Sequence, residues 1–119
     1  MTLSLNGGDL TLTVPASVHA KQQTVNWETN AYDLYDGSDS SPLLEIVDGG
    51  GAYDLSTFAK TCLNGRTAWT DDGGESGTVV VGDPGFHAVA AYWRNLTGDR
   101  LREAHAIISS IRLGFGAKC

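Results

Sequence analysis

Residues 86–113, FHAVAAYWRNLTGDRLREAHAIISSIRL, carry the strongest structural signals in the chain. Residues 86–93 form the most continuous apolar run and predict a buried strand. Residues 95–98 predict a turn, and residues 99–112 repeat apolar side chains at helical spacing. The repeated positions are Leu101, Ala104, Ile108 and Ile111. An amphipathic helix needs an apolar surface to cover, so this stretch predicts a sheet with a helix packed on it.

The residues around the predicted helix suit its two ends. Thr97 or Asp99 can accept hydrogen bonds from the first backbone amides, and Asp99 also suits the positive end of the helix dipole. Arg112 falls in the last turn, and Gly114 is typical of a C-terminal cap. We therefore expect a helix over residues 98–112.

Shorter signals in the first half of the chain predict a strand and a hairpin. Residues 9–14 alternate apolar and polar side chains and end at Pro15, which predicts a half-buried strand. Residues 16–24 show no period and are expected to form a loop. Residues 25–36 predict one long strand, or two short ones interrupted near residues 29–30. The polar turn 37–42 then leads into a returning strand at 43–47.

The second half predicts a meander that leads into the final strand and helix. The glycines at 49–51 break the chain. Tyr53 starts a short strand, or residues 54–60 form a short helix. The Asn64-Gly65 turn opens a strand at 66–70, and the acidic loop 71–77 connects it to a strand at 78–81. We predict a single domain, residues 1–119, of the α+β class. It has a mostly antiparallel sheet of about five to seven strands and a C-terminal amphipathic helix on one face.

The composition excludes several partner classes. The 119 residues carry a formal net charge of −6. Nucleic acids and anionic membranes require a basic patch, so neither is an expected partner. The sequence has no apolar run of transmembrane length, so we expect no membrane insertion. Residues 1–5 lack the features of a signal peptide, so we expect either a cytoplasmic protein or an exported one whose signal is not in this sequence.

The chain has two cysteines, Cys62 and Cys119. Neither belongs to a C-x-x-C pair, and two sulfur ligands do not complete a zinc site. One disulfide would fix the C-terminal tail and would favour an oxidising compartment, periplasmic or secreted. The alternative is two unrelated thiols.

No residue pattern predicts catalysis, a metal site or a cofactor. The three histidines, His19, His87 and His105, lack a spacing that would make a metal site local. A hydrolase would need a carboxylate or thiol within bonding reach of His87 or His105. Ser109 and Ser110 lie in the predicted helix, where hydroxyls bond back to the preceding turn.

The aromatic and acidic residues predict a binding face. Strand side chains alternate between the two faces, so Tyr92 and Trp93 cannot both be buried. Aromatic residues often anchor interfaces, and acidic loops suit a basic partner. The candidate binding residues are Trp27, Tyr35, Trp69, Asp71, Asp72, Glu75 and Trp93.

Three segments resemble the PsbP-like α/β sandwich domains of bacterial envelope proteins. They are the early strand end Leu12-Thr-Val-Pro15, the Asn64-Gly65 turn that opens a strand, and residues 106–113, AIISSIRL. The resemblance implies a non-enzymatic accessory or protein-binding domain and carries no catalytic residues.

These observations lead to one functional hypothesis and two alternatives. The first is a non-enzymatic protein-binding module of the bacterial envelope or secreted space, such as an inhibitor or toxin-immunity protein that masks a basic surface. The second is a small-ligand or glycan-binding module that uses exposed tryptophans. The third is a small hydrolase.

Overall fold

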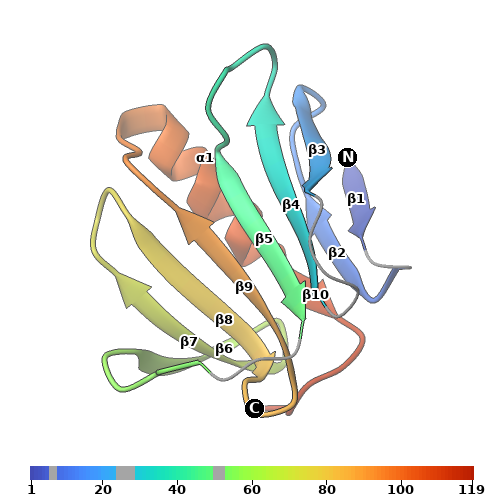
Figure 1. Ribbon diagram of the computed structural model, residues 1–119, viewed down its shortest axis with the longest axis vertical. Coiled ribbons are helices and arrows are strands. Elements are labelled where there is room, and N and C mark those ends of the chain that lie inside the picture. Colours follow the sequence, from blue (N-terminus) through green and yellow to red (C-terminus); the bar gives the residue numbers. More distant parts are fainter. Residues whose placement is uncertain (6–7, 24–28, 50–52) are drawn as a thin grey trace.

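The computed structural model describes residues 1–5, 8–23, 29–49 and 53–119. These residues form two sheets and one helix, α1 (Figure 1). The smaller sheet has the strand order β1-β2-β10, and the larger has the order β3-β4-β5-β9-β8-β7-β6. The elements are β1 (Thr2–Leu5), β2 (Leu10–Thr13), β3 (Val18–Gln23), β4 (Thr29–Asp36), β5 (Leu44–Gly49), β6 (Ala59–Leu63), β7 (Arg66–Asp72), β8 (Gly77–Asp83), β9 (His87–Trp93), α1 (Gly98–Ser109) and β10 (Arg112–Leu113).

The larger sheet consists of two antiparallel meanders that meet in its middle. Strands β3, β4 and β5 form one meander, and β6 to β9 form the other. They join where β5 pairs antiparallel with β9. Short turns can connect such neighbours, which explains why local turn signals predicted much of this sheet.

Helix α1 and the smaller sheet cover one face of the larger sheet. Figure 1 shows α1 crossing behind β9 and β5, and β2 of the smaller sheet contacts it. The core between these layers includes Leu12, Leu34, Ile46, Trp93 and Ile107, each at most 1% exposed. Burying one large apolar side chain contributes about 1.5–3 kcal/mol to stability. These residues therefore hold the helix and the two sheets together.

The α+β prediction with five to seven strands is wrong, because the described chain is mostly β, with ten strands in two sheets and one short helix. Part of the error lies at the end of α1. The helix stops at Ser109, and Ser110 is its C-cap. The Thr13 amide donates to Ser110 Oγ over 2.8 Å, and β10 then pairs with β2. The pairing of β10 with β2, about a hundred residues earlier in the chain, therefore ends the helix although the helical spacing of apolar residues continues. Gly114 is not the C-cap.

The start of α1 is closer to the prediction. Thr97 is the N-cap with extended backbone angles, although its side chain makes no capping hydrogen bond. Asp99 lies in the first turn. Both serine hydroxyls bond back as expected: Ser109 Oγ donates to His105 O at 2.8 Å, and Ser110 Oγ donates to Ile107 O at 2.6 Å.

Two further errors concern strands at the edges of the larger sheet. The expected loop 16–24 contains β3, and the residues expected to form a helix at 54–60 instead lead into β6. In β3 Val18 is the buried residue, and every residue of β6 is exposed or half-buried. An edge strand with little buried surface has no clear apolar alternation, so its sequence does not resemble a strand.

Other local predictions are confirmed. The strand expected at 9–14 is β2, and Leu10, Leu12 and Val14 are buried. The hairpin of β4 and β5 forms, and the Asn64-Gly65 turn has positive φ angles of 48° and 83°. Residues 25–28 of the predicted strand, and most of the glycine break at 49–51, lie outside the described residues.

Candidate functional site

The face of the larger sheet opposite α1, here called the open face, carries a line of polar side chains. The pairing register places Asp71 beside Thr78, Thr78 beside Tyr92, and Tyr92 beside Glu45. The same line continues from Glu45 to Asp33 on β4 and from Asp33 to Lys21 on β3. Paired residues of neighbouring strands share a face. We call these six residues, Asp71, Thr78, Tyr92, Glu45, Asp33 and Lys21, the acidic row.

The acidic row is long and accessible. It crosses six strands, which corresponds to about 24 Å at the usual strand spacing. Asp71 and Lys21 are exposed, and the four residues between them are half-buried. Three carboxylates and one ammonium group therefore lie along one line that a partner can reach.

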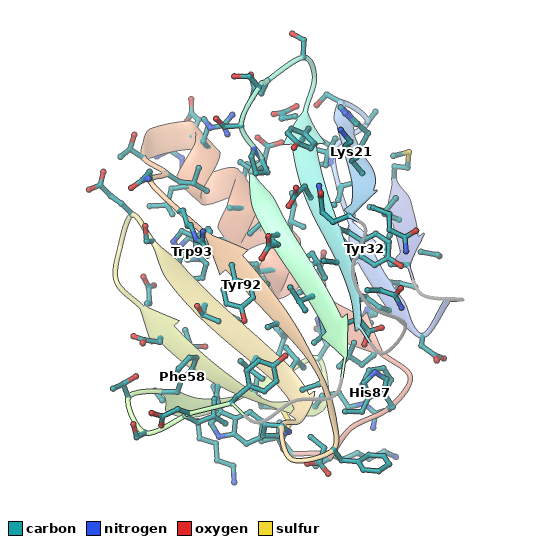
Figure 2. All side chains as sticks on the ribbon, in the orientation of Figure 1. Lys21, Tyr32, Phe58, His87, Tyr92 and Trp93 are labelled. Atoms are coloured by element: carbon teal, nitrogen blue, oxygen red, sulfur yellow. A yellow bond between two sulfur atoms is a disulfide. The ribbon has the colours of Figure 1, made fainter. Side chains whose placement is uncertain are left out.

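A second, apolar line runs beside the acidic row and is partly covered. Trp69 pairs with Val80, Val80 with Ala90, and Ala90 with Val47. Val80 and Ala90 are completely buried, because a lid formed by Tyr53, Leu55 and Phe58 packs on them together with Trp69 and Tyr92. Figure 2 labels Phe58 and Tyr92 in this part of the sheet. The lid covers the apolar line and leaves the acidic row accessible.

Two tyrosines of this face keep their protons well above neutral pH. Burial raises the pKa of Tyr92, and the nearby Glu45 carboxylate raises it further, against a smaller opposite effect of Arg94. Burial also raises the pKa of Tyr53, with smaller contributions from Tyr92 and Asp48. Their hydroxyls are therefore neutral hydrogen-bond donors.

The end of β7 and the β7–β8 loop carry further negative charge close to the acidic row. Asp71, Asp72 and Glu75 are all exposed. Thr57 Oγ1 donates to Asp71 Oδ2 at 3.1 Å, and the Gly74 amide donates to Asp72 Oδ1 at 2.8 Å. These bonds orient two of the three carboxylates while all three remain at the surface.

The structure places the four predicted aromatic binding residues differently. Trp93 is 1% exposed, so it is not one of the exposed tryptophans expected from the sequence. Its Nε1 donates to Gly74 O at 2.9 Å, and its ring meets the edge of His105. Trp69 is half-buried beside the lid, and Tyr35 is half-buried on the open face. Trp27 lies outside the described residues.

The sequence interpretation missed Asp33, Glu45 and Tyr92 as members of one site. Each follows the strand alternation in its own segment, so its face could have been deduced. Which residues of other strands lie beside them depends on register, and one shifted residue reverses the face. The acidic row is therefore visible only once the strands are paired.

His87 and Asp48 form a separate polar contact at one end of the sheet. Their Nε2 and Oδ1 atoms are 2.6 Å apart, and Asp48 is 1% exposed. The His87 ring stacks on Phe115 with 3.9 Å between ring centroids. This contact supplies the carboxylate within bonding reach of His87 that the hydrolase hypothesis requires.

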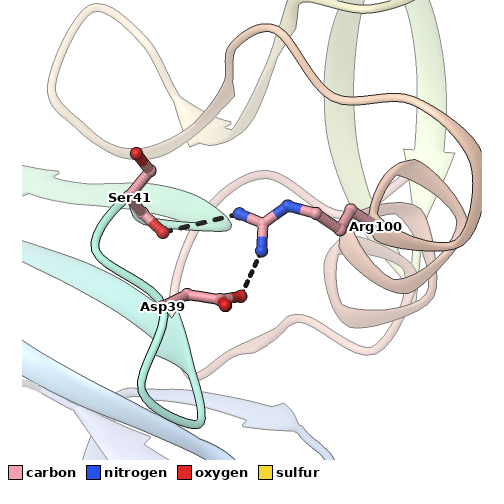
Figure 3. A network of polar contacts seen from close by, with 3 residues as sticks. All are labelled: Asp39, Ser41 and Arg100. Atoms are coloured by element: carbon pink, nitrogen blue, oxygen red, sulfur yellow. Dashed lines mark hydrogen bonds and ion pairs between the residues drawn. The ribbon is translucent and has the colours of Figure 1, made fainter.

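Arg100 joins the start of α1 to the loop after β4. Its guanidinium contacts the Asp39 carboxylate and donates to Ser41 O at 3.4 Å (Figure 3). These three residues, with Arg94, line an open cavity of about 620 Å³. The Asp39 carboxylate compensates the positive charge of Arg100, so this cavity is a weak candidate for anion binding.

The predicted disulfide is present between Cys62 and Cys119, whose Cα atoms are 5.8 Å apart. The tail also bonds to the β6–β7 hairpin. Ala117 O accepts from the Thr67 amide at 2.8 Å, and the Cys119 amide donates to Gly65 O at 3.2 Å. A disulfide-bonded fold is compatible with a periplasmic or secreted location.

Among the described residues, no helix has the length and apolar character needed to cross a membrane. The same residues contain no cluster of three or more potential metal ligands. Comparisons with protein-family models, curated proteins and solved structures found no match.

Proposed function

We propose that this chain is a non-enzymatic protein-binding module that recognises a basic surface through the acidic row. The observation that carries the proposal is the alignment of Asp71, Glu45 and Asp33 across the open face. Strand pairing already fixes the backbone that carries these carboxylates, so little entropy is lost when a partner binds them. Half-buried Tyr92, which lies between Asp71 and Glu45 in the row, supplies an aromatic anchor.

The overall charge supports the same partner class. A net charge of −6 attracts a basic protein and increases its association rate at low salt. A standard interface covers roughly 800 Å² on each partner, and the protein measures 36 × 30 × 24 Å along its principal axes.

The cellular setting of the proposal is the bacterial envelope or the secreted space. The Cys62–Cys119 disulfide supports an oxidising compartment. The resemblance to PsbP-like domains supports an accessory role. We propose that the chain acts as an inhibitor or a toxin-immunity protein, which would mask a basic active-site surface of its partner.

The test compares two triple variants of equal charge. The first removes the carboxylates of the acidic row through Asp33→Asn, Glu45→Gln and Asp71→Asn. The control removes three carboxylates elsewhere through Asp9→Asn, Asp83→Asn and Asp99→Asn. Wild-type protein, immobilised with its disulfide intact, is used to isolate partners from envelope and secreted fractions. Each purified partner is then titrated against all three proteins by calorimetry.

We expect the acidic-row variant to bind the partner at least about tenfold more weakly than the control, because the row carboxylates lie within the interface. The difference should shrink as salt is added. A partner that binds both triple variants equally, or no partner that distinguishes them, contradicts the proposal.

The His87–Asp48 contact favours a hydrolase as the second candidate. His87 is the general base in this alternative, and its activity is assayed on chromogenic ester, phosphate and glycoside substrates without any partner. Turnover that the wild type shows and His87→Ala loses would replace the binding proposal. The glycan-binding alternative has less support, since Trp93 is buried.

A further inference from the structure

A groove separates the β6–β7 hairpin from α1 on the side of the sheet opposite the acidic row. Thr61 and Leu63 of β6 form one wall, and Ile108 and Ser109 of α1 form the other. The buried Trp93 lies at its floor. The groove encloses about 220 Å³, which is room for one large apolar side chain.

The hairpin turn holds this groove at a fixed width. Asn64 Nδ2 donates to Ser109 O at 2.9 Å and to Ile111 O at 2.7 Å. These carbonyls lie at the C-terminal end of α1, where helical partners are missing. The disulfide at Cys62 further ties β6 to the C-terminal tail. The two walls are therefore preorganised.

Strand β6 borders the groove and ends the larger sheet. Among the described strands it pairs with β7 alone, on one of its two sides. An edge strand can accept an extended peptide, whose main chain completes the ladder while alternate side chains enter neighbouring pockets.

We propose that this groove binds an extended peptide segment of a partner protein, added antiparallel or parallel to β6. One apolar side chain of the peptide fills the groove, and a lysine or arginine beside it meets Asp72 at the mouth. The negative net charge of the chain favours a basic peptide as the ligand over a second copy of the chain, because two copies of net charge −6 repel each other. The site is separate from the acidic row and does not depend on it.

The test begins with a phage-displayed library of short random peptides selected on the disulfide-bonded protein. The selected sequence is synthesised, and its affinity is measured for two single variants. Ser109→Trp fills the groove, whereas Ala106→Trp is the matched control on α1, exposed and outside the groove. Thermal melts establish that both variants fold.

We expect selected peptides to combine an apolar residue with a neighbouring basic one. Ser109→Trp should weaken binding at least about tenfold and Ala106→Trp should not, since only the first blocks the pocket. Methylation of single peptide amides should abolish binding at alternate positions, because every second amide of an added strand faces β6. The acidic-row triple variant should still bind, which separates this proposal from the previous one.

Three results of the peptide experiments would overturn the inference. They are the selection of no peptide, equal affinity of the two tryptophan variants, and equal effects of methylation at every position. Self-association of the wild type that Ser109→Trp removes would assign the groove to a second copy and would also reject the peptide.

Discussion

The Nε2 atom of His87 lies 2.6 Å from Oδ1 of Asp48, and the carboxylate is buried while the imidazole is partly exposed. His87 thus covers a buried carboxylate at the point where β5 and β9 pair, with Phe115 of the tail stacked on it. A buried charge that loses a hydrogen-bond donor keeps its desolvation penalty. Through this contact the C-terminal tail therefore contributes to the stability of the sheet.

Replacement of His87 by phenylalanine should destabilise the fold. His87→Phe keeps a ring against Phe115 but removes one hydrogen-bond partner of Asp48, so the free energy of unfolding should fall by about 1–3 kcal/mol. The measurement is urea unfolding followed by circular dichroism. The control is His19→Phe, which changes an exposed histidine stacked on Tyr35 and should shift stability by less than about 0.5 kcal/mol. Equal effects of the two substitutions would show that the bond to Asp48 contributes nothing.

The start of β8 should not tolerate a side chain at Gly77. A Cβ atom there would clash with the Trp93 ring and lie 2.8 Å from Asp71 O. Gly77→Ala should therefore lower the free energy of unfolding by about 1–3 kcal/mol through overpacking. Gly85→Ala is the control, because its nearest neighbour is 3.7 Å away. If Gly77→Ala is as stable as the control, Trp93 does not occupy the position described.

Loss of the disulfide should reduce stability more than any of these changes. The bond joins residues 57 apart, so the chain-entropy model gives about 4 kcal/mol for its removal. We expect this loss in the Cys62→Ser, Cys119→Ser double variant, measured by urea unfolding. Adding reductant should change the wild type but not the variant. Free thiols detected by alkylation in the unreduced wild type would contradict the assignment.

Glu103 should make stability depend on pH in a particular direction. Burial raises its pKa above the ordinary value of 4.5, and a hydrogen bond with Asp36 raises it further. The folded state thus prefers protonated Glu103, and this contribution is complete below pH 4.5 and lost as pH rises through the raised pKa. Glu103→Gln cannot ionise, so it removes this loss of stability with rising pH. Its neutral side-chain amide can still donate a hydrogen bond to Asp36.

The expected result is a variant that matches the wild type in acid and becomes more stable than it toward neutral pH. Melting temperatures between pH 4 and pH 7 provide the measurement. The gain should be small, because solvent screens a partly exposed carboxylate. Asp36 acts in the opposite direction, since hydrogen bonds from Ser17 and Glu103 lower its pKa. A variant that is less stable than the wild type at pH 7 would refute the assigned direction.

Local sequence signals were sufficient wherever a few neighbouring residues set the structure of their own segment. The apolar alternation of β2, the Asn64-Gly65 turn and the apolar run of β9 all produce a pattern within a few neighbouring residues. Strand alternation also predicted that Tyr92 and Trp93 lie on opposite faces, and the structure makes Trp93 the buried one of the two. Each of these features depends on the period of a strand or on the backbone freedom of a turn.

Other features depended on partners distant in sequence. The end of α1 is decided by Ser110 meeting Thr13, and β6 exists because β7 pairs with it. The acidic row needs the register of six strands, which no single segment contains. The sequence by itself determined the central strands, the turns and the start of the helix. Tertiary structure alone decided the edge strands, the helix end and the candidate site, because their energies come from contacts between distant segments.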